Sequence, residues 1–546
     1  MKSVVLIILD GFGLAPPGPG NAIQLANPTN INSYLYSYPN TTLRASGQAV
    51  GLPPEEAGNT EVGHINLGAG RVVYQDLPRI NMSIADGSFY KTEAFLKAVD
   101  HVYKTGGQLH FLGLIGGENS VHVHSDIEHL YALLYFAKEK KVQNVYIHAI
   151  TDGRDSPPKS AETIIGQFEE KIKEMGIGRI ATVMGRYFAM DRDHRWERTA
   201  KAYFCLTQGQ GNQATSAKEA ILNSYNKDVT DEFIPPTNIV EDNKPIALIK
   251  EGDAVIFFNF RIDRPRQLTK AFVLDEFENQ ANIPASFDPY AVKYHKTHFP
   301  ELENLTAPFK RGDKIKNLFF VTITEYEKNL PVAVAFPPVI VQLPLGRILS
   351  EARLPQLRIT ESEKERFVTF YFNGQREAAF PLEDRLIIPS PKVPTYDLKP
   401  EMSAYELTNS ILAKMRESKY KLIVVNFPNP DMVGHTGNIQ ATITAIKTVD
   451  NCIGKIVQEA MILEYSVIIT ADHGNAEQKI DLKTGEISTE HTTNPVPFIF
   501  IDEAYQGRFT KLQTGILGDV APTILSVMGL QKPDTMTGRN LLEELK

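Results

Sequence analysis

The chain opens with the apolar run Val4-Val5-Leu6-Ile7-Ile8-Leu9, which ends abruptly at Asp10. A continuous apolar run without polar alternation is typical of a strand that is buried on both faces of a sheet. We therefore predict a buried β-strand over residues 4–9, with Asp10 at its carboxyl end.

Five later apolar runs have the same form. They are Leu112 to Ile115 before Gly116, Val145 to Ile147 before Asp152, Val255 to Phe258 before Arg261, Leu422 to Val425 before Asp431, and Val467 to Ile469 before Asp472. Helix-length segments, such as 127–141 and 441–460, separate them, and this alternation predicts parallel α/β sheets. Ligands bind at the carboxyl ends of strands in such sheets. Nearly all the candidate catalytic residues follow these runs.

The distribution of motifs indicates that one domain is inserted into another. Acidic and histidine motifs lie near the two termini, and arginine motifs lie in the middle of the chain. We predict one domain from residues 1–75 and 338–546, and an inserted domain from residues 76–337. The cuts fall near Asp76 and at the proline-rich Phe336-Pro337-Pro338, where the periodicity is interrupted. Residues 282–313, with four prolines, are typical of an irregular surface insertion.

The composition excludes several classes of protein. A net charge of −8 disfavours a nucleic-acid or membrane-surface role. Cys205 and Cys452 are too few for a disulfide framework or a cysteine metal site. The first apolar run is too short for a signal sequence or a membrane span, so we expect a cytoplasmic protein. Arginines cluster within 186–198 and 261–266, which favours a small anionic ligand.

Three motifs in the last third of the chain carry potential metal ligands. They are Asn429 to His435, Thr470 to Asn475, and His491 to Pro497. Their histidines and aspartates, together with Asp10, are sufficient for two divalent-metal sites. Each residue by itself could equally be a cap, a turn residue or a hydrogen-bonded core group. The joint occurrence of separated clusters favours the metal centre.

Thr60 lies in the segment Gly58-Asn59-Thr60-Glu61, where a helix is expected to begin. One interpretation is that Thr60 is only the N-cap of this helix. The other is that Thr60 is a nucleophile, because a helix N-terminus beside two metals would stabilise an alkoxide and an incoming phosphate. The two interpretations are compatible.

The combined motifs resemble the cofactor-independent phosphoglycerate mutases. The resemblance rests on Asp10-Gly11, Gly58 to His64, Asp152-Gly153-Arg154-Asp155, Gly185 to Asp193, Phe258 to Arg261, and the three C-terminal motifs, and it extends in the family's order from Asp10 to Gly538. It implies an α/β fold in which an alkaline-phosphatase-like metal-binding domain is split by an inserted α/β transferase domain. It also implies interconversion of 3-phosphoglycerate and 2-phosphoglycerate in glycolysis and gluconeogenesis.

The resemblance implies specific roles at the metal centre. One divalent metal would be held by Asp10, Thr60, Asp472 and His473, and the other by Asp431, His435 and His491. We expect Mn²⁺, with Mg²⁺, Co²⁺ and Zn²⁺ as alternatives. Thr60 would accept the phosphoryl group and return it to the other glycerate oxygen, so no bisphosphoglycerate is needed.

The resemblance also implies a substrate-binding set. It comprises His122, Arg154, Asp155, Arg186, Arg192, Arg261 and Arg264 in the inserted domain, with Lys364 from the metal-binding domain. Asp155 is the candidate base and His122 its possible assistant. Alternatively, residues 152–155 form only a turn and residues 192–198 only a solvated helix face. We expect a monomer that binds a small molecule and neither nucleic acid nor membrane.

Three features depart from the family pattern. Thr60 replaces the usual serine, the loop Gly116 to Val121 before His122 differs, and residues 282–313 exceed the usual length. A phosphomonoesterase or phosphopentomutase with the same metals is the nearest alternative function. A catalytically silent binding protein is a second alternative. The motifs of the inserted domain favour the mutase, and the complete set of potential metal ligands disfavours the silent protein.

Overall fold

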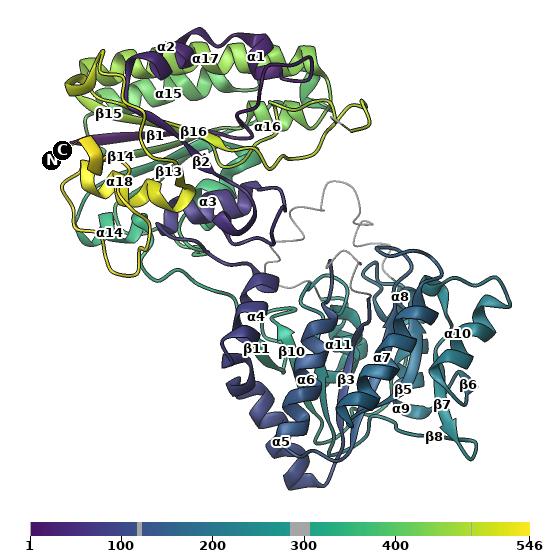
Figure 1. The fold of residues 1–546 in the computed structure, drawn as a ribbon. Helices are drawn as coiled ribbons and strands as arrows, with labels where there is room; N and C mark the ends of the chain where they lie inside the picture. Colours follow the sequence, from purple (N-terminus) through teal and green to yellow (C-terminus); the bar gives the residue numbers. More distant parts are fainter. Residues whose placement is uncertain (1, 117–122, 284–305, 482, 546) are drawn as a thin grey trace. The chain divides into compact units, whose positions relative to one another are not determined.

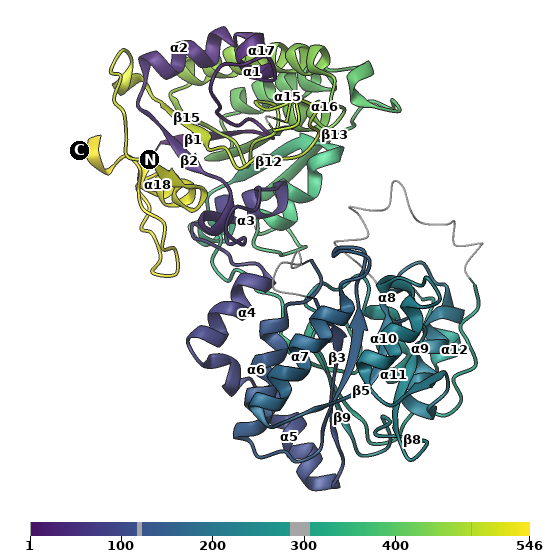
Figure 2. The ribbon, with the colours of Figure 1, turned by 45° about the vertical axis from the view of Figure 1, so that its right-hand side comes forward.

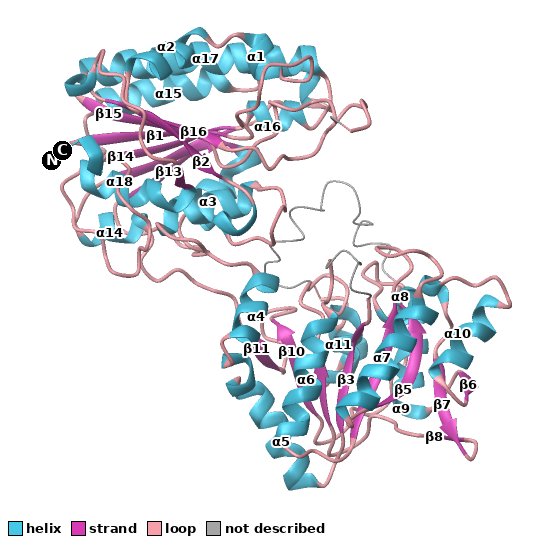
Figure 3. Cartoon of the chain, in the orientation of Figure 1, coloured by secondary structure: helices cyan, strands magenta, loops and turns pink. Residues whose placement is uncertain are grey.

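The computed structural model describes residues 2–116, 123–283, 306–481 and 483–545, so His122 and much of the 282–313 segment lie outside the described residues. The chain forms two compact units (Figure 1). The terminal unit comprises Met1–Pro78 and Val339–Lys546, and the inserted unit comprises Arg79–Pro338. In both, a sheet lies between helices, which confirms the predicted α/β class (Figure 3). None of the described helices is both long and apolar enough to cross a membrane.

The terminal unit contains an eight-stranded sheet in the order β13-β12-β14-β1-β15-β16-β2-β17. Its strands are β1 (Ser3–Leu9), β2 (Asn40–Arg44), β12 (Gln356–Glu361), β13 (Glu383–Ile388), β14 (Leu422–Phe427), β15 (Tyr465–Thr470), β16 (Val496–Ile501) and β17 (Gly515–Ile516). Strand β1 pairs in parallel with β14 on one side and β15 on the other. The three strands predicted in this part of the sequence are therefore adjacent.

Helices cover both faces of this sheet (Figure 1). One face carries α1 (Ala22–Ala26), α2 (Thr29–Ser37), α15 (Ala404–Arg416) and α17 (Ile439–Ile462), and the other carries α3 (Thr60–Ala69), α14 (Leu345–Glu351) and α18 (Val520–Val527). The short helix α16 (Asn429–Gly434) follows β14. The buried residues Val4 to Leu9 of β1 belong to one hydrophobic core with residues of α15, α17 and α18.

The inserted unit contains a nine-stranded sheet in the order β11-β10-β9-β3-β4-β5-β7-β6, with β8 paired to β7. Its strands are β3 (Leu109–Leu114), β4 (Val145–Thr151), β5 (Arg179–Gly185), β6 (Asn212–Ala214), β7 (Thr237–Glu241), β8 (Lys244–Pro245), β9 (Ala254–Phe257), β10 (Phe319–Thr324) and β11 (Ala333–Phe336). Strands β9, β3, β4 and β5 are parallel neighbours. Their carboxyl ends therefore meet at one edge of the sheet.

Helix α4 (Asp76–Ala85) begins in the terminal unit and continues into the inserted unit. The described α-helices that lie wholly within the inserted unit are α5 (Glu93–Thr105), α6 (Ile127–Glu139), α7 (Ala161–Met175), α8 (Arg186–Ala189), α9 (Trp196–Gln208), α10 (Ala217–Tyr225), α11 (Arg266–Val273) and α12 (Phe277–Gln280). Helices α6 and α7 lie side by side (Figure 2). Tyr131 of α6 stacks on Phe168 of α7. Helices α9 and α11 pack together in a second hydrophobic cluster that includes Leu112 and Val255 of the sheet.

Helix α3 places Thr60 at its first position. The N-cap is Asn59, whose side chain accepts a hydrogen bond from the Val62 amide at 3.1 Å, so the interpretation of Thr60 as the N-cap is wrong. Glycines allow α3 to lie against its neighbours: a Cβ at Gly63 would lie 2.6 Å from the Asp472 carbonyl oxygen. The close packing of α3 thus fixes the position of the Thr60 hydroxyl.

We predict that Gly63→Ala lowers the free energy of unfolding by about 1–3 kcal/mol, because the added methyl group cannot fit against Asp472. The matched control is Gly166→Ala in α7, where an added Cβ meets nothing within 4 Å. The control should stabilise the protein by about 0.5–1 kcal/mol through its helix propensity. Thermal unfolding measures both, and equal melting temperatures would contradict the packing argument.

Candidate functional site

Three adjacent parallel strands bring three acidic side chains together in the terminal unit. Asp10 follows β1, Asp431 lies in α16 after β14, and Asp472 follows β15. Because β1 lies between β14 and β15, the three carboxylates meet at one edge of the sheet. All three are at most 2% exposed. Such a concentration of buried negative charge requires cations nearby.

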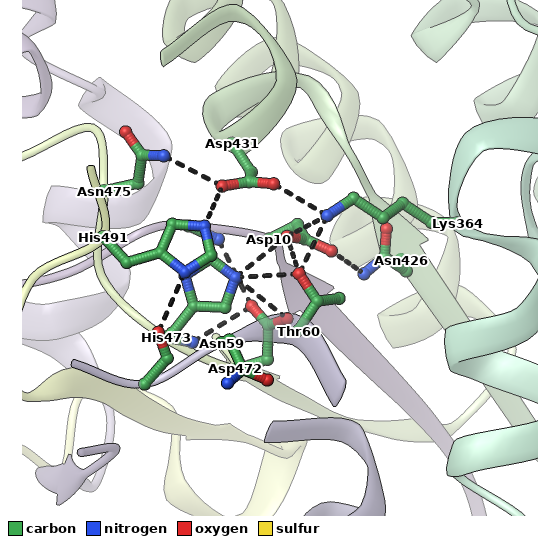
Figure 4. Close-up of polar contacts among 12 residues, drawn as sticks. Asp10, Asn59, Thr60, Lys364, Asn426, Asp431, Asp472, His473, Asn475 and His491 are labelled. Carbon is green, nitrogen blue, oxygen red and sulfur yellow. Dashed lines mark hydrogen bonds and ion pairs between the residues drawn. The ribbon is translucent and has the colours of Figure 1, made fainter. Parts of the chain in front are cut away.

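The first group of potential ligands consists of Asp10, Asp472 and His473, with ligand atoms within 4.8 Å of one another. The Thr60 Oγ1 atom lies 3.0 Å from His473 Nε2 and 3.4 Å from Asp10 Oδ1 (Figure 4). Burial lowers the pKa of His473, but the Asp472, Asp431 and Asp10 carboxylates have the larger, opposite effect, and together they raise the pKa to about 9. The ring is therefore protonated at neutral pH when no metal is bound.

The second group consists of Asp431, His435 and His491. Both Nε2 atoms approach the same oxygen, Asp431 Oδ1, at 3.1 Å from His435 and 3.2 Å from His491, and they lie 3.0 Å from each other. The Nδ1 atoms face backbone carbonyl oxygens, Thr489 at 2.8 Å and Gly58 at 2.9 Å. Donation from Nδ1 leaves the Nε2 lone pairs directed at the carboxylate oxygen, an arrangement that suits a metal ion.

Lys364 lies beside both groups. Its ammonium is 2.8 Å from Asp10 Oδ1, 2.7 Å from Asp431 Oδ2 and 3.0 Å from Thr60 Oγ1. Burial lowers the pKa of Lys364, while Asp10 and Asp431 raise it, with a net rise above its usual range. The side chain predicted to bind substrate is thus a charged neighbour of the proposed nucleophile.

The oxygen and nitrogen ligand atoms of the two groups are suitable for two divalent metals. Among the described residues, the buried Asp472 Oδ2 has no hydrogen-bond donor. The nearest ring nitrogen is His64 Nδ1, which lies 3.2 Å from Asp472 Oδ2. This nitrogen instead forms its hydrogen bond with the Thr60 carbonyl oxygen, at 2.9 Å. Burial raises the pKa of Asp472, but His473, His64 and Lys364 lower it to about 2. An ionised, buried oxygen without a donor is a suitable metal ligand.

Arg186 is the centre of the cluster in the inserted unit. It follows β5, is 2% exposed, and contacts Asp152 Oδ1 and Asp155 Oδ2 at 2.5 Å each. Asp152 Oδ1 also accepts the amides of Arg154 and Asp155 at 3.3 and 3.2 Å. Residues 152–155 therefore form a hydrogen-bonded turn, as one of the two interpretations of the sequence proposed. The same turn presents two carboxylates to Arg186.

The other predicted arginines differ in their surroundings. Arg192 and Arg261 both contact Asp263, at 2.7 and 3.0 Å, while Arg264 donates to the Met190 carbonyl oxygen at 3.2 Å. Burial and then Arg186 and Arg192 lower the pKa of Arg264 to about 10. Arg154 has an exposed side chain 3.5 Å from Glu232. Four of the five arginines thus lie within a partly buried, positively charged cluster that suits an anion.

His124 and Asp263 belong to this cluster and were missed in the sequence. Arg186 donates to His124 Nε2 at 2.8 Å, and the same nitrogen lies 3.6 Å from Asp155 Oδ2. Burial and then Arg186 lower the pKa of His124 to about 3, so the ring is neutral. The segment Val121 to His124 contains two histidines two positions apart. That spacing was the available signal, and it does not choose between His122 and His124.

Two further buried residues support the first ligand group. Asn426, at the end of β14, donates to Asp10 Oδ2 at 2.8 Å and faces His64 Nε2 at 3.1 Å. His64 in turn contacts the carbonyl oxygen of Thr60. Helix α3 and the Asp10 carboxylate are thereby held by one hydrogen-bonded chain.

Two family models match the chain. The model described as the BPG-independent PGAM N-terminus matches residues 80–328, and the model described as type I phosphodiesterase / nucleotide pyrophosphatase matches residues 359–495. The first range lies within the inserted unit and the second within the terminal unit. The second match agrees with the alkaline-phosphatase-like domain that was predicted.

Full-length relatives and a solved structure are also similar to this chain. The 2,3-bisphosphoglycerate-independent phosphoglycerate mutase of Moorella thermoacetica is 49% identical over 541 residues, covering 99% of this chain and 98% of that protein. The protein of the same name from Clostridium kluyveri is 50% identical over 546 residues, covering 99% of each. A crystal structure of Leishmania mexicana phosphoglycerate mutase aligns with a TM-score of 0.59 at 28% identity, covering 99% of this chain and 97% of that one.

We predict that metal affinity rises with pH. The raised pKa of His473, about 9, means that a metal must displace a proton below that pH. The affinity for Mn²⁺ should therefore rise about tenfold for each pH unit up to about 9. Calorimetric titration in buffers with different ionisation enthalpies would measure both the affinity and the released proton. A constant affinity between about pH 6 and about pH 9 would contradict this assignment of His473.

Proposed function

Because the chain belongs to the 2,3-bisphosphoglycerate-independent phosphoglycerate mutases, we propose that Thr60 carries the phosphoryl group between the two glycerate oxygens. The chain is an isomerase that interconverts 3-phosphoglycerate and 2-phosphoglycerate. The observation that supports Thr60 is the position of its hydroxyl at the N-terminus of α3, 3.0 Å from both Lys364 Nζ and His473 Nε2. Positive charge and a helix N-terminus stabilise an alkoxide at this point.

The reaction consists of two transfers in opposite directions. The Thr60 oxygen forms a bond to phosphorus as the bond from phosphorus to the 3-oxygen of glycerate breaks. The glycerate 2-oxygen then attacks the same phosphorus, and the bond to Thr60 breaks. When bound, two divalent metals supply Lewis-acid activation of the hydroxyl and neutralise charge on the transferred group. The ammonium of Lys364 stabilises the threonine alkoxide that is formed and released again.

The groups of the inserted unit are proposed to bind and deprotonate the substrate. The guanidinium groups of Arg186, Arg192, Arg261 and Arg264, with Arg154, match the carboxylate and phosphate oxygens of phosphoglycerate. Burial raises the pKa of Asp155, but the Arg186 guanidinium has the larger, opposite effect. The pKa of Asp155 therefore lies below its usual value, and the carboxylate is ionised. In the first transfer the proton of the Thr60 hydroxyl ends on the glycerate 3-oxygen that leaves. In the second transfer Asp155 would take the proton of the attacking 2-hydroxyl, and that proton returns to the Thr60 oxygen that is released.

Mn²⁺ is the proposed metal, with Mg²⁺, Co²⁺ and Zn²⁺ as alternatives. The family is metal-dependent, and mixed carboxylate and imidazole ligands suit Mn²⁺. The Leishmania mexicana structure was determined at low cobalt concentration, which supports Co²⁺ as an alternative. A monomer in the cytoplasm completes the proposal, and the acidic net charge of −8 supports a role away from nucleic acids and membrane surfaces.

The alternative functions have less support. A phosphomonoesterase or phosphopentomutase would share the metal ligands, but the match over residues 80–328 is to the phosphoglycerate mutase model. A silent binding protein would not need both ligand groups, and the terminal unit contains both.

We predict that Thr60→Ala abolishes the conversion of 3-phosphoglycerate to 2-phosphoglycerate, because it removes the oxygen that would carry the phosphoryl group. Thr60→Ser should remain active, since serine retains that oxygen and loses only the methyl group that restricts χ1. Phosphorus NMR with Mn²⁺ and without bisphosphoglycerate would follow both variants. Mass spectrometry of acid-quenched wild type should detect phosphate on Thr60. Conversion by the alanine variant would rule out the covalent route.

We predict that His124→Asn lowers kcat/KM by about 100-fold, because Arg186 loses the ring nitrogen that it contacts. The comparison variant is His122→Asn, two positions earlier in the same segment, which tests the histidine that the family resemblance implies. Steady-state kinetics with 3-phosphoglycerate measures both variants. A larger loss in His122→Asn than in His124→Asn would assign the role to His122.

A further inference from the structure

Glu477 has a buried carboxylate that neither ligand group includes. It is 2% exposed. Its Oε2 atom accepts the backbone amides of Gly13 at 3.0 Å and Asn475 at 2.9 Å. Its Oε1 atom accepts the Asn494 side-chain amide at 3.0 Å and the Thr492 hydroxyl. Four donors thus satisfy the two oxygens of one carboxylate, and hydrogen bonds to a carboxylate are charge-assisted and strong.

The four donors come from the three loops that carry most of the potential metal ligands. Gly13 lies in the loop after β1 that begins with Asp10, and Asn475 lies in the loop after β15 that contains Asp472 and His473. Thr492 and Asn494 lie in the segment before β16, directly after His491. Because β1, β15 and β16 are neighbours in the sheet, one side chain can reach all three loops.

The surrounding backbone is shaped to admit this carboxylate. A Cβ at Gly13 would lie 2.3 Å from Glu477 Cδ, and one at Gly474 would lie 2.4 Å from Glu477 Oε1. Gly474 also forms an isolated bridge with Thr492, and the rings of His473 and His491 stack with centroids 4.0 Å apart. The loop after β15 and the segment before β16 are therefore in register at the point where they present ligands.

We propose that Glu477 is a positioning residue that sets the geometry of both metal sites by fixing these three loops. The inference rests on the proposed metal centre. Partners of this kind hold ligands in orientation, and their loss weakens metal binding by about 10- to 100-fold. Loss of the carboxylate should therefore weaken the binding of both ions. Loss of the Thr492 hydroxyl alone should weaken only the binding of the ion held by Asp431, His435 and His491.

Asp450 provides a matched control for a purely structural role. It is a buried carboxylate of the same unit, 3% exposed, which accepts the amides of Asn30 and Ile31 at 3.1 and 2.9 Å and the Asn30 side chain at 3.0 Å. It contacts no residue of either ligand group. Asp450→Asn and Glu477→Gln remove the same charge from similarly bonded positions.

The experiment titrates MnCl₂ into metal-free wild type, Glu477→Gln, Thr492→Val and Asp450→Asn, below the melting temperature of each. Calorimetry gives the affinities, and electron paramagnetic resonance counts free Mn²⁺. Wild type should bind two ions. Glu477→Gln should bind both about 10- to 100-fold more weakly. Thr492→Val should bind one ion more weakly and the other as wild type does. Asp450→Asn should melt at a lower temperature with wild-type affinities.

Several results would overturn the inference. Wild-type affinities in Glu477→Gln would show that the carboxylate does not position the ligands, and an equal loss in Asp450→Asn would show a general effect of destabilisation. Unchanged binding in Thr492→Val with weakened binding in Glu477→Gln would assign the effect to charge alone. If Glu477→Gln does not fold, Thr492→Val still decides the question. Binding of fewer than two ions by wild type would refute the metal centre itself.

Discussion

The meeting of three buried carboxylates at the end of β14, β1 and β15 is the constraint on which the terminal unit depends. Asp10, Asp431 and Asp472 cannot be buried together without cations, since like charges at low dielectric are strongly unfavourable. Lys364 supplies one ammonium between Asp10 and Asp431. Divalent metals at the two ligand groups would supply the rest. The same charge balance raises the pKa of His473 and lowers that of Asp472. The packing that buries the carboxylates therefore also sets the protonation of the potential metal ligands.

The proposed nucleophile depends on this arrangement through packing as well as charge. Asn59 caps α3, and Gly63 allows the helix to lie against Asp472, so the Thr60 hydroxyl is held beside the ligands. Glu477 applies the same logic to three loops, where one carboxylate replaces the regular hydrogen bonding that strands would provide. Precise placement of functional groups thus comes from hydrogen bonds that surround them rather than from the groups alone.

Sequence patterns predicted strands that contain a continuous apolar run, including β1, β14 and β15. They did not predict β12, because its buried residues include Gln356, Arg358 and Glu361, which break the apolar run. Periodicity reports burial only where burial coincides with apolar side chains. Most of the potential metal ligands were recognisable for a different reason: all members of the two ligand groups except His491 follow predicted strands, and the carboxyl ends of parallel strands meet at one edge.

The sequence by itself determined which chemical groups are present, that they follow strands of an α/β fold, and that they match a mutase family. The tertiary structure decided which groups are neighbours. It assigned the helix cap to Asn59 instead of Thr60, placed His124 against Arg186, and set Lys364 between two carboxylates. The physical reason is that hydrogen bonds and ion pairs join residues hundreds of positions apart, and their geometry is fixed only when sheet order and loop packing bring them together.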